Sequence, residues 1–126
     1  NELRREAQEV HRWNLLHPDQ PQKTSYVEQC LDGSEGPVVA STDYMRAFPD
    51  QIRPYVQRRY VSLGTDGFGR SDSREALRRF FEVDRYYVTL AALKALADEG
   101  TIPAAKAAEA IKKYGLDADR PNPVNV

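Results

Sequence analysis

Two short apolar stretches, 37-PVVAS-41 and 60-YVSLG-64, predict the centre of the fold. Each is an apolar run between turn-forming residues, a pattern typical of a buried strand. The segment between them has helical character but contains Pro49 and Pro54, so we expect two short helical pieces that end near Val56. A strand, a helical crossover and a second strand form a βαβ unit, which predicts a parallel pair with a right-handed connection.

Helical patterns flank this unit on both sides. Residues Glu2–Leu16 place apolar side chains on one face, and the helix must end before Pro18 because proline disfavours helix in the preceding residue. The apolar residues of Arg85–Glu99 are spread around most of the helix, so we expect it to be largely buried. Further helices are predicted from Ser25 to Leu31, after the N-cap candidates Ser41, Thr42 and Asp43, after Asp72 or Ser73, and over Pro103–Tyr114.

Two strands are too few for an independent sheet. Parallel sheets need cover on both faces, and a two-stranded sheet is not stable by itself. We therefore predict that residues 1–126 form a single, partial α/β domain, with a mostly parallel sheet flanked by helices that lacks its first strands. The alternative is that a second copy or another chain completes the sheet.

The composition indicates a soluble globular protein that lacks the net positive charge needed to attract nucleic acid or an anionic membrane. Of the 126 residues, 40% are hydrophobic and 29% charged, which fits one folded domain. The net charge is −1, so we expect no nucleic-acid or membrane partner, and the longest apolar run, near Val88–Ala97, is shorter than the roughly 20 residues of a membrane span. Cys30 is the single cysteine, which indicates a reducing compartment, and we expect it to be a small buried side chain.

The stretch 64-GTDGFGRSDSRE-75 is compositionally unusual. Glycines between a strand and a helix are typical of anion-binding loops. Their spacing, G-x-x-G-x-G, nevertheless matches neither the dinucleotide nor the Walker pattern. Asp66 and Asp72 would repel a phosphate, although Arg70 could offset one of them. We favour a structural or contact loop over a phosphate site, because glycines at such turns usually serve the backbone.

An aromatic side chain in this stretch, Phe68, lies between two glycines and close to Arg70, a combination typical of subunit contacts. We predict an interface loop that consists of Asp66, Gly67, Phe68, Gly69, Arg70, Ser71 and Asp72. We predict no catalytic, cofactor-binding or metal-binding residue in this chain.

Other candidate residues do not assemble a catalytic centre. His11 and His17 have no serine or cysteine partner at a recognisable spacing, and one cysteine does not make a zinc site. Asp43 is interpreted as an acid at a helix N-terminus. Tyr86 is interpreted as core or interface packing, and Arg78 as part of a solvated face.

Several stretches carry a family resemblance: 12-RWNLLHP-18, 40-ASTDYM-45, 63-LGTDGFGRSDSRE-75, 81-FEVD-84 and 116-LDAD-119. They resemble the C-terminal end of the bacterial, homodimeric pyruvate dehydrogenase (acetyl-transferring) component, a thiamine-diphosphate-dependent member of the transketolase superfamily. The similarity covers most of the chain and is weakest over 19–36 and the last six residues. The shorter core, residues 66–71, is shared with the wider superfamily.

The resemblance implies a transketolase C-terminal-type α/β domain, the third of three, in a cytoplasmic homodimer. It also implies that thiamine diphosphate and Mg²⁺ bind in the other two domains, where pyruvate is decarboxylated and the two-carbon unit passes to a lipoyl group of the dihydrolipoyl acetyltransferase component. Gly64-Thr65-Asp66-Gly67 differs from the thiamine motif, Gly-Asp-Gly followed by asparagine about two dozen residues later, and no asparagine follows until Asn122. We therefore expect this piece to bind no cofactor and to be inactive alone.

Two alternatives remain open at this point. The chain could be a non-catalytic interaction module that docks a partner of the 2-oxo acid dehydrogenase complex. A free-standing α/β enzyme or nucleotide binder is a third interpretation, and it rests on the glycines alone.

Overall fold

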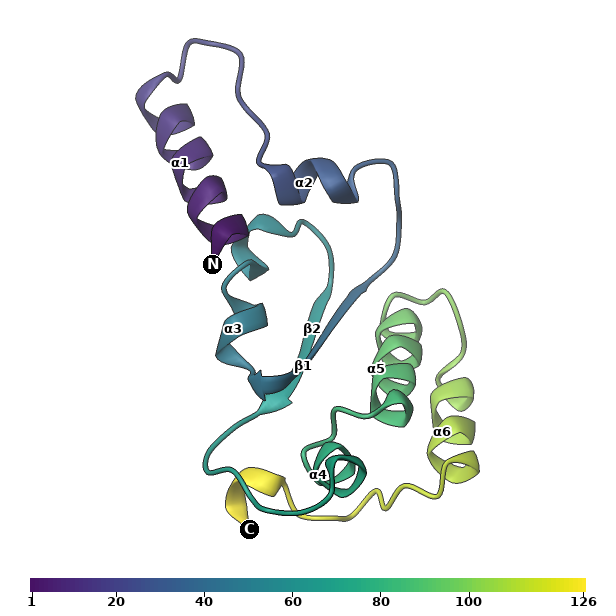
Figure 1. Cartoon of the computed structure of the whole chain (residues 1–126). Coiled ribbons are helices and arrows are strands. Elements are labelled where there is room, and N and C mark those ends of the chain that lie inside the picture. Colours follow the sequence, from purple (N-terminus) through teal and green to yellow (C-terminus); the bar gives the residue numbers. More distant parts are fainter.

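The computed structural model describes all 126 residues and has an extended outline in which a small sheet joins two groups of helices (Figure 1). The elements, in chain order, are α1 (Glu2–Leu16), α2 (Tyr26–Leu31), β1 (Val38–Met45), α3 (Ala47–Asp50), η1 (Arg53–Tyr55), β2 (Tyr60–Thr65), α4 (Arg74–Phe80), α5 (Arg85–Asp98), α6 (Ala104–Lys113) and η2 (Pro123–Asn125), where η denotes a 3₁₀ helix. No helix combines the length and the apolar composition that a membrane-spanning segment needs.

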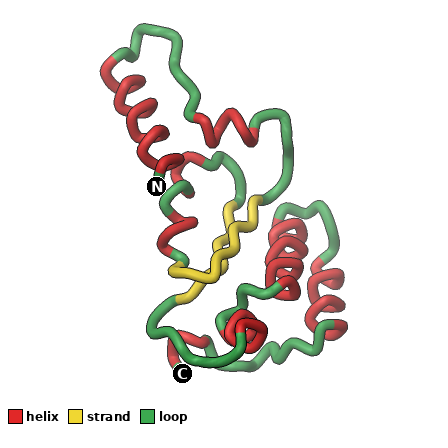
Figure 2. The backbone as a smooth tube through the Cα atoms, viewed as in Figure 1, coloured by secondary structure: helices red, strands yellow, loops and turns green.

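The sheet consists of β1 and β2, which pair in parallel with Val38 opposite Tyr60 and Ser41 opposite Leu63. The chain between the two strands forms α3 and η1, as Pro49 and Pro54 predict. Figure 1 shows α3 on one face of the sheet and α5 on the other, and Figure 2 shows the two strands side by side between them. The parallel pairing and the helical connection that the βαβ pattern predicts are confirmed.

Strand β1 is longer than the sequence predicts. Ser41, Thr42 and Asp43 were expected to cap a helix, but all three lie in β1, which ends at Met45. The pairing with β2 becomes irregular between Ser41 and Met45, and within this irregularity the Thr42 hydroxyl accepts a hydrogen bond from the Tyr44 amide (3.1 Å). The helix-capping prediction at these residues is wrong because Ser41 pairs with Leu63 and Met45 pairs with Thr65, so pairing with β2 on both sides keeps Thr42 and Asp43 extended despite their local capping preference.

The apolar core lies on the α3 face of the sheet. Val27, Val56 and Tyr60 are each at most 8% exposed and pack together. Along β2 the residues alternate between buried and half-buried, so Tyr60 and Ser62 point into this core. The Tyr60 hydroxyl donates to the Pro49 carbonyl (2.6 Å), which ties β2 to α3.

Helix caps are confirmed where the sequence has a strong capping residue. Ser25 accepts from the Glu28 amide (3.4 Å), Ser73 from the Ala76 amide (3.2 Å), and Asp84 from the Tyr86 and Tyr87 amides (3.1 Å each). Gly100 and Gly115, which follow α5 and α6, have φ of 79° and 63°, as expected for glycine after a helix end.

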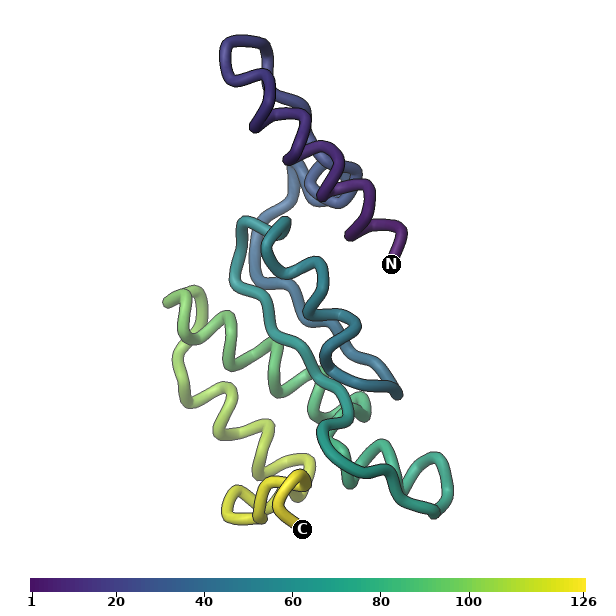
Figure 3. Tube along the Cα trace, turned by 90° about the vertical axis from the view of Figure 1, so that its left-hand side faces the viewer, coloured from purple at the N-terminus to yellow at the C-terminus, as the bar shows by residue number.

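Two burial predictions are wrong within this chain. Only Ala95 of α5 is buried, because the helix packs on a sheet of two strands on one side and on α6 on another, and the rest of its apolar surface is half-exposed. Cys30 is exposed, because the buried face of α2 is the one that carries Val27. Figure 3 shows α5 and α6 side by side, with the following segment continuing from α6 toward α4.

Candidate functional site

The interface loop begins at the carboxyl end of β2 and leads into α4 (Figure 1). All seven of its residues are exposed, and Phe68 is 98% exposed, the highest value of any large apolar residue in the chain. At its start, Asp66 forms an ion pair with Arg46 (3.3 Å). The Arg70 guanidinium donates to the Val126 carbonyl (2.8 Å) and lies over the Phe80 ring (4.3 Å to the centroid). The loop is therefore held by polar contacts at Asp66 and Arg70, while Phe68 between them contacts solvent.

Two of the three glycines in this stretch have a structural reason to be glycine. A Cβ on Gly64 would lie 2.8 Å from the backbone of Arg46, so β2 and the chain after β1 approach each other too closely for a side chain. Gly67 has φ of 77°, a left-handed conformation that L residues rarely adopt. A Cβ on Gly69 would meet no atom within 4 Å, and its φ is not positive. These contacts support the structural interpretation of the loop over the phosphate-binding one.

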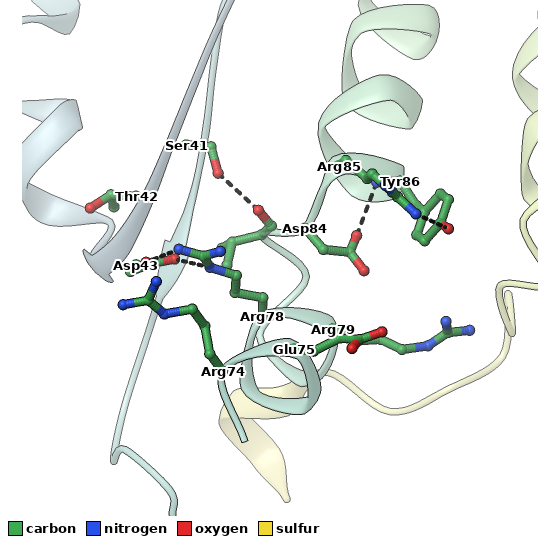
Figure 4. Close-up of a pocket in the computed structure, with 11 residues that line it drawn as sticks. Ser41, Thr42, Asp43, Arg74, Glu75, Arg78, Arg79, Asp84, Arg85 and Tyr86 are labelled. Carbon is green, nitrogen blue, oxygen red and sulfur yellow. Dashed lines mark hydrogen bonds and ion pairs between the residues drawn. The ribbon is translucent and has the colours of Figure 1, made fainter. Parts of the chain in front are cut away.

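Two cavities flank the carboxyl end of β1. One, of about 800 Å³, lies between β1, α4 and the start of α5, and Figure 4 shows its lining. The other, of about 560 Å³, lies between β1, the interface loop and α4, and is lined by Tyr44, Met45 and Leu77 among others. Asp43, Arg74 and Arg78 line both cavities, so these three side chains form the partition between them.

The partition is built on a bidentate ion pair. Arg78 Nε and Nη2 donate to the two carboxylate oxygens of Asp43 at 2.9 and 2.7 Å, and in Figure 4 the Arg74 guanidinium also lies beside Asp43. The hydrogen bond from Arg78 lowers the pKa of Asp43, and the positive charges of Arg78 and Arg74 act in the same direction against a partial loss of hydration. The predicted role of Asp43 as a helix N-terminal acid is wrong, because the residue joins a strand to α4.

The other candidates are dispersed. His11 contacts Glu28 (3.0 Å) and His17 contacts the Trp13 carbonyl (2.8 Å), both at the α1 end of the molecule. Tyr86 packs on the ring of Tyr114, the residue that follows α6, with centroids 4.9 Å apart, as its packing interpretation predicts. No three side chains of histidine, cysteine, aspartate or glutamate gather where they could hold a metal ion.

Sequence reasoning missed two arginines with structural partners. Arg78 was assigned to a solvated face, but it pairs with a residue 35 positions away. Arg120 was not singled out, yet its guanidinium contacts carbonyl oxygens of α4 about 40 positions away. No local signal could have found either pair, because periodicity and capping patterns report only on neighbours within a few residues.

Residues 8–84 match the family described as "Transketolase-like TK C-terminal domain", a span that exceeds half of the chain. The chain belongs to the transketolase-like TK C-terminal domain family. The matched part extends from within α1 to the Asp84 cap of α5. It includes both strands, the whole interface loop, and Arg74 and Arg78 of the partition between the cavities.

Curated relatives of this transketolase-like domain carry one name. Proteins called "Pyruvate dehydrogenase E1 component" are 66% identical over 125 residues in Cupriavidus necator, 60% over 126 in Pseudomonas aeruginosa and 51% over 123 in Escherichia coli K12. The alignments cover 97–99% of this chain and 14% of each relative. The chain thus spans about one seventh of the length of these relatives, and the family resemblance seen in the sequence is confirmed.

Proposed function

We propose that this chain is part of a pyruvate dehydrogenase E1 component. The observation that carries the proposal is the 66% identity with the protein of that name in Cupriavidus necator, which extends over 99% of this chain. On this proposal the whole protein decarboxylates pyruvate with thiamine diphosphate and Mg²⁺ and reductively acetylates the lipoyl group of the dihydrolipoyl acetyltransferase component. It acts as a homodimer in the cytoplasm, a location in keeping with the single cysteine.

The sequence of this chain departs from the thiamine motif, since Gly64-Thr65-Asp66-Gly67 differs from Gly-Asp-Gly and no asparagine follows until Asn122. Mg²⁺ is usually bound by one or two carboxylates together with the phosphate oxygens of its ligand. Asp66, the acid within the glycine stretch, is already paired with Arg46. We therefore propose that thiamine diphosphate and Mg²⁺ are held by other domains, and that this domain supplies no group to the reacting atoms.

The role that we propose for this domain is to pack against a second subunit or a neighbouring domain through the interface loop. Four large apolar side chains that follow the regularly paired part of the two strands in the chain are exposed: Phe68 at 98%, Tyr44 at 62%, Met45 at 50% and Phe48 at 45%. Tyr44 and Phe48 already contact each other (ring centroids 5.1 Å apart). Aromatic residues, methionine and arginine are the types enriched at the centres of protein interfaces, which supports this surface as the contact.

The full-length polypeptide provides the test of both parts of the proposal. Its release of CO₂ from pyruvate should require thiamine diphosphate and Mg²⁺, and absence of this activity would overturn the assignment. For the interface, Phe68→Ala should weaken dimerisation at least about tenfold, about 1.4 kcal/mol, in analytical ultracentrifugation. Leu15→Ala, which truncates an exposed apolar side chain (77%) on α1 outside the interface loop, is the matched control and should dimerise like the wild type. Equal dimerisation by wild type and Phe68→Ala would show that Phe68 is not an interface anchor of the dimer.

A further inference from the structure

The segment after α6, Leu116–Val126, follows an unusual course. It has no regular periodicity and contains only the short η2, yet it reaches back to two elements that precede it by 40 residues or more, α4 and the interface loop. Figure 1 shows it running beneath α4 to end beside the segment that follows β2. We call Leu116–Val126 the tail strap.

Arg120 makes the central contact of the tail strap. Its Nη2 donates to the Phe80 carbonyl (3.1 Å), and its Nη1 donates to the Arg79 carbonyl (3.3 Å) and to the Tyr87 hydroxyl of α5 (3.1 Å). The last carbonyl groups of a helix have no partner inside the helix, and positive charge is favoured at that end. One guanidinium therefore caps α4 and joins it to α5.

The turn between α4 and α5 contains a strained residue that Arg120 contacts. Glu82 is the one residue other than glycine with a positive φ, 61°, in this chain, and this conformation is disfavoured for L residues. Its carboxylate lies 3.7 Å from Arg120 Nε, and both side chains are mostly shielded from solvent. The tail strap thus contacts the α4–α5 turn at its strained residue.

The far end of the tail strap reaches the interface loop. The Val126 carbonyl accepts the hydrogen bond from Arg70, and a Cβ on Gly67 would lie 3.3 Å from a Val124 methyl group. The Phe80 ring has Arg70 on it at 4.3 Å and Arg120 at 5.8 Å, so one aromatic ring links the loop to the strap.

We propose that the tail strap sets the position of the interface loop, with Arg120 and Arg70 as the positioning residues. Arg120 fixes the strap on the end of α4, and the strap then presents Val124 and Val126 to Gly67 and Arg70. The loop has few contacts of its own, so its course depends on a segment about 50 residues later in the chain. The inference concerns the geometry of the loop and stands whether or not Phe68 contacts a second subunit.

Limited proteolysis of the full-length polypeptide tests the proposal. Chymotrypsin cleaves after Phe68 when the loop opens into an extended form, so the cleavage rate reports on how firmly the loop is held. Arg120→Gln should raise that rate at least about tenfold, and should also speed hydrogen exchange in peptides from residues 79–87. Arg79→Gln makes the same change of charge on α4, and since the Arg79 side chain has no hydrogen bond or ion pair, its rate should equal that of the wild type.

The outcomes separate the strap from simpler roles of Arg120. Faster exchange in 79–87 with unchanged cleavage after Phe68 would mean that Arg120 only caps α4, and would overturn the proposal. Should Arg120→Gln fail to fold, Arg70→Gln decides, because it breaks the other end of the link. We expect at least about tenfold faster cleavage after Phe68 with wild-type exchange in 79–87, and unchanged cleavage would overturn the proposal.

The subunit dissociation constant distinguishes this inference from the proposed function. A loop that is loosened by Arg120→Gln while dimerisation stays at the wild-type level supports the tail strap and counts against the loop as a dimer contact. Loss of dimerisation in Phe68→Ala with no effect of Arg120→Gln or Arg70→Gln on cleavage supports the contact and overturns the strap.

Discussion

The two faces of the sheet are held by different forces. On the α3 face, Val27, Val56 and Tyr60 form an apolar cluster that is closed to solvent. On the α5 face, Val83 (7% exposed) and Ala95 (2%) are buried, but most side chains of α5 are half-exposed or exposed, and specific polar contacts connect the elements. These are the Asp43–Arg78 pair, the bond from the Ser41 hydroxyl to the Val83 carbonyl (3.2 Å), and the contacts of Arg120.

The α3 face contributes mainly to the stability of the fold, and the α5 face determines the positions of α4 and the interface loop. Burial of apolar surface is non-directional and is the larger favourable contribution to folding. Guanidinium contacts are directional and contribute little to stability where they are exposed, but they determine where α4 and the interface loop lie. Changes on the α3 face should therefore alter stability, and changes on the α5 face should alter geometry.

The largest effect should come from Tyr60 on the α3 face. Tyr60→Ala removes a ring that is 7% exposed and should lower the free energy of unfolding by about 3–5 kcal/mol, because it leaves a cavity and an unpaired Pro49 carbonyl. Tyr60→Phe keeps the ring and should cost about 1 kcal/mol. Urea unfolding followed by circular dichroism measures both. A loss from Tyr60→Ala as small as that from Tyr60→Phe would contradict an apolar origin of stability on this face.

A smaller loss is expected at the junction of the strands. Gly64→Ala places a methyl group 2.8 Å from the Arg46 backbone, which cannot move without disturbing the end of β1, so we expect a loss of about 1–3 kcal/mol. Gly69→Ala, five residues later, meets no atom within 4 Å and should leave the urea midpoint unchanged or slightly higher. Equal effects of the two changes would show that the close approach at Gly64 is not limiting.

The contribution of the Asp43–Arg78 pair on the α5 face to stability should depend on pH. Because Arg78 lowers the pKa of Asp43, the carboxylate contributes stability above its ordinary pKa of about 3.9, and this contribution is lost as the pH falls through the lower pKa of the folded state. Wild type and Asp43→Asn should therefore differ in thermal midpoint near neutral pH and converge at low pH. Asp19→Asn, at an exposed aspartate with no ion pair, should parallel the wild type throughout. A difference that persists unchanged to low pH would point to packing instead of charge.

The smallest effect on stability is expected at Phe68. The ring is 98% exposed within this chain, so Phe68→Ala should change the free energy of unfolding of the isolated chain by less than about 0.5 kcal/mol. The same substitution is expected to weaken dimerisation of the full-length protein, and this contrast is what defines a contact residue. A clear loss of stability in the isolated chain would show that Phe68 belongs to the fold.

The sequence predicted much of the local structure. The helices with strong caps were found because Ser25, Ser73 and Asp84 act on amides two or three residues away. Prediction was wrong at Ser41–Asp43, where pairs with β2 at Ser41 and at Met45 hold the intervening residues in the strand despite their capping preference. It was also wrong about the burial of α5, since apolar composition indicates what a helix can bury but not what covers it within this chain.

The sequence also predicted part of the candidate site. The interface loop was predicted from residues 66–72 alone, because its glycines, its aromatic residue and its arginine are adjacent in the chain. The family was predicted from this stretch together with residues 12–18, 40–45, 63–75, 81–84 and 116–119, and the family comparison confirms it. Its role as a contact remains a prediction.

What the sequence by itself determined are the features set by neighbouring residues: the caps, the proline breaks, the two strands and the family. The tertiary structure alone decided which distant groups meet, as Asp43 with Arg78, Arg120 with the end of α4, and Val126 with Arg70. The physical reason is the distance along the chain over which each interaction acts. Local preferences act over a few residues, whereas an ion pair or a cap supplied from 35–56 positions away forms only after the chain has closed the intervening loop.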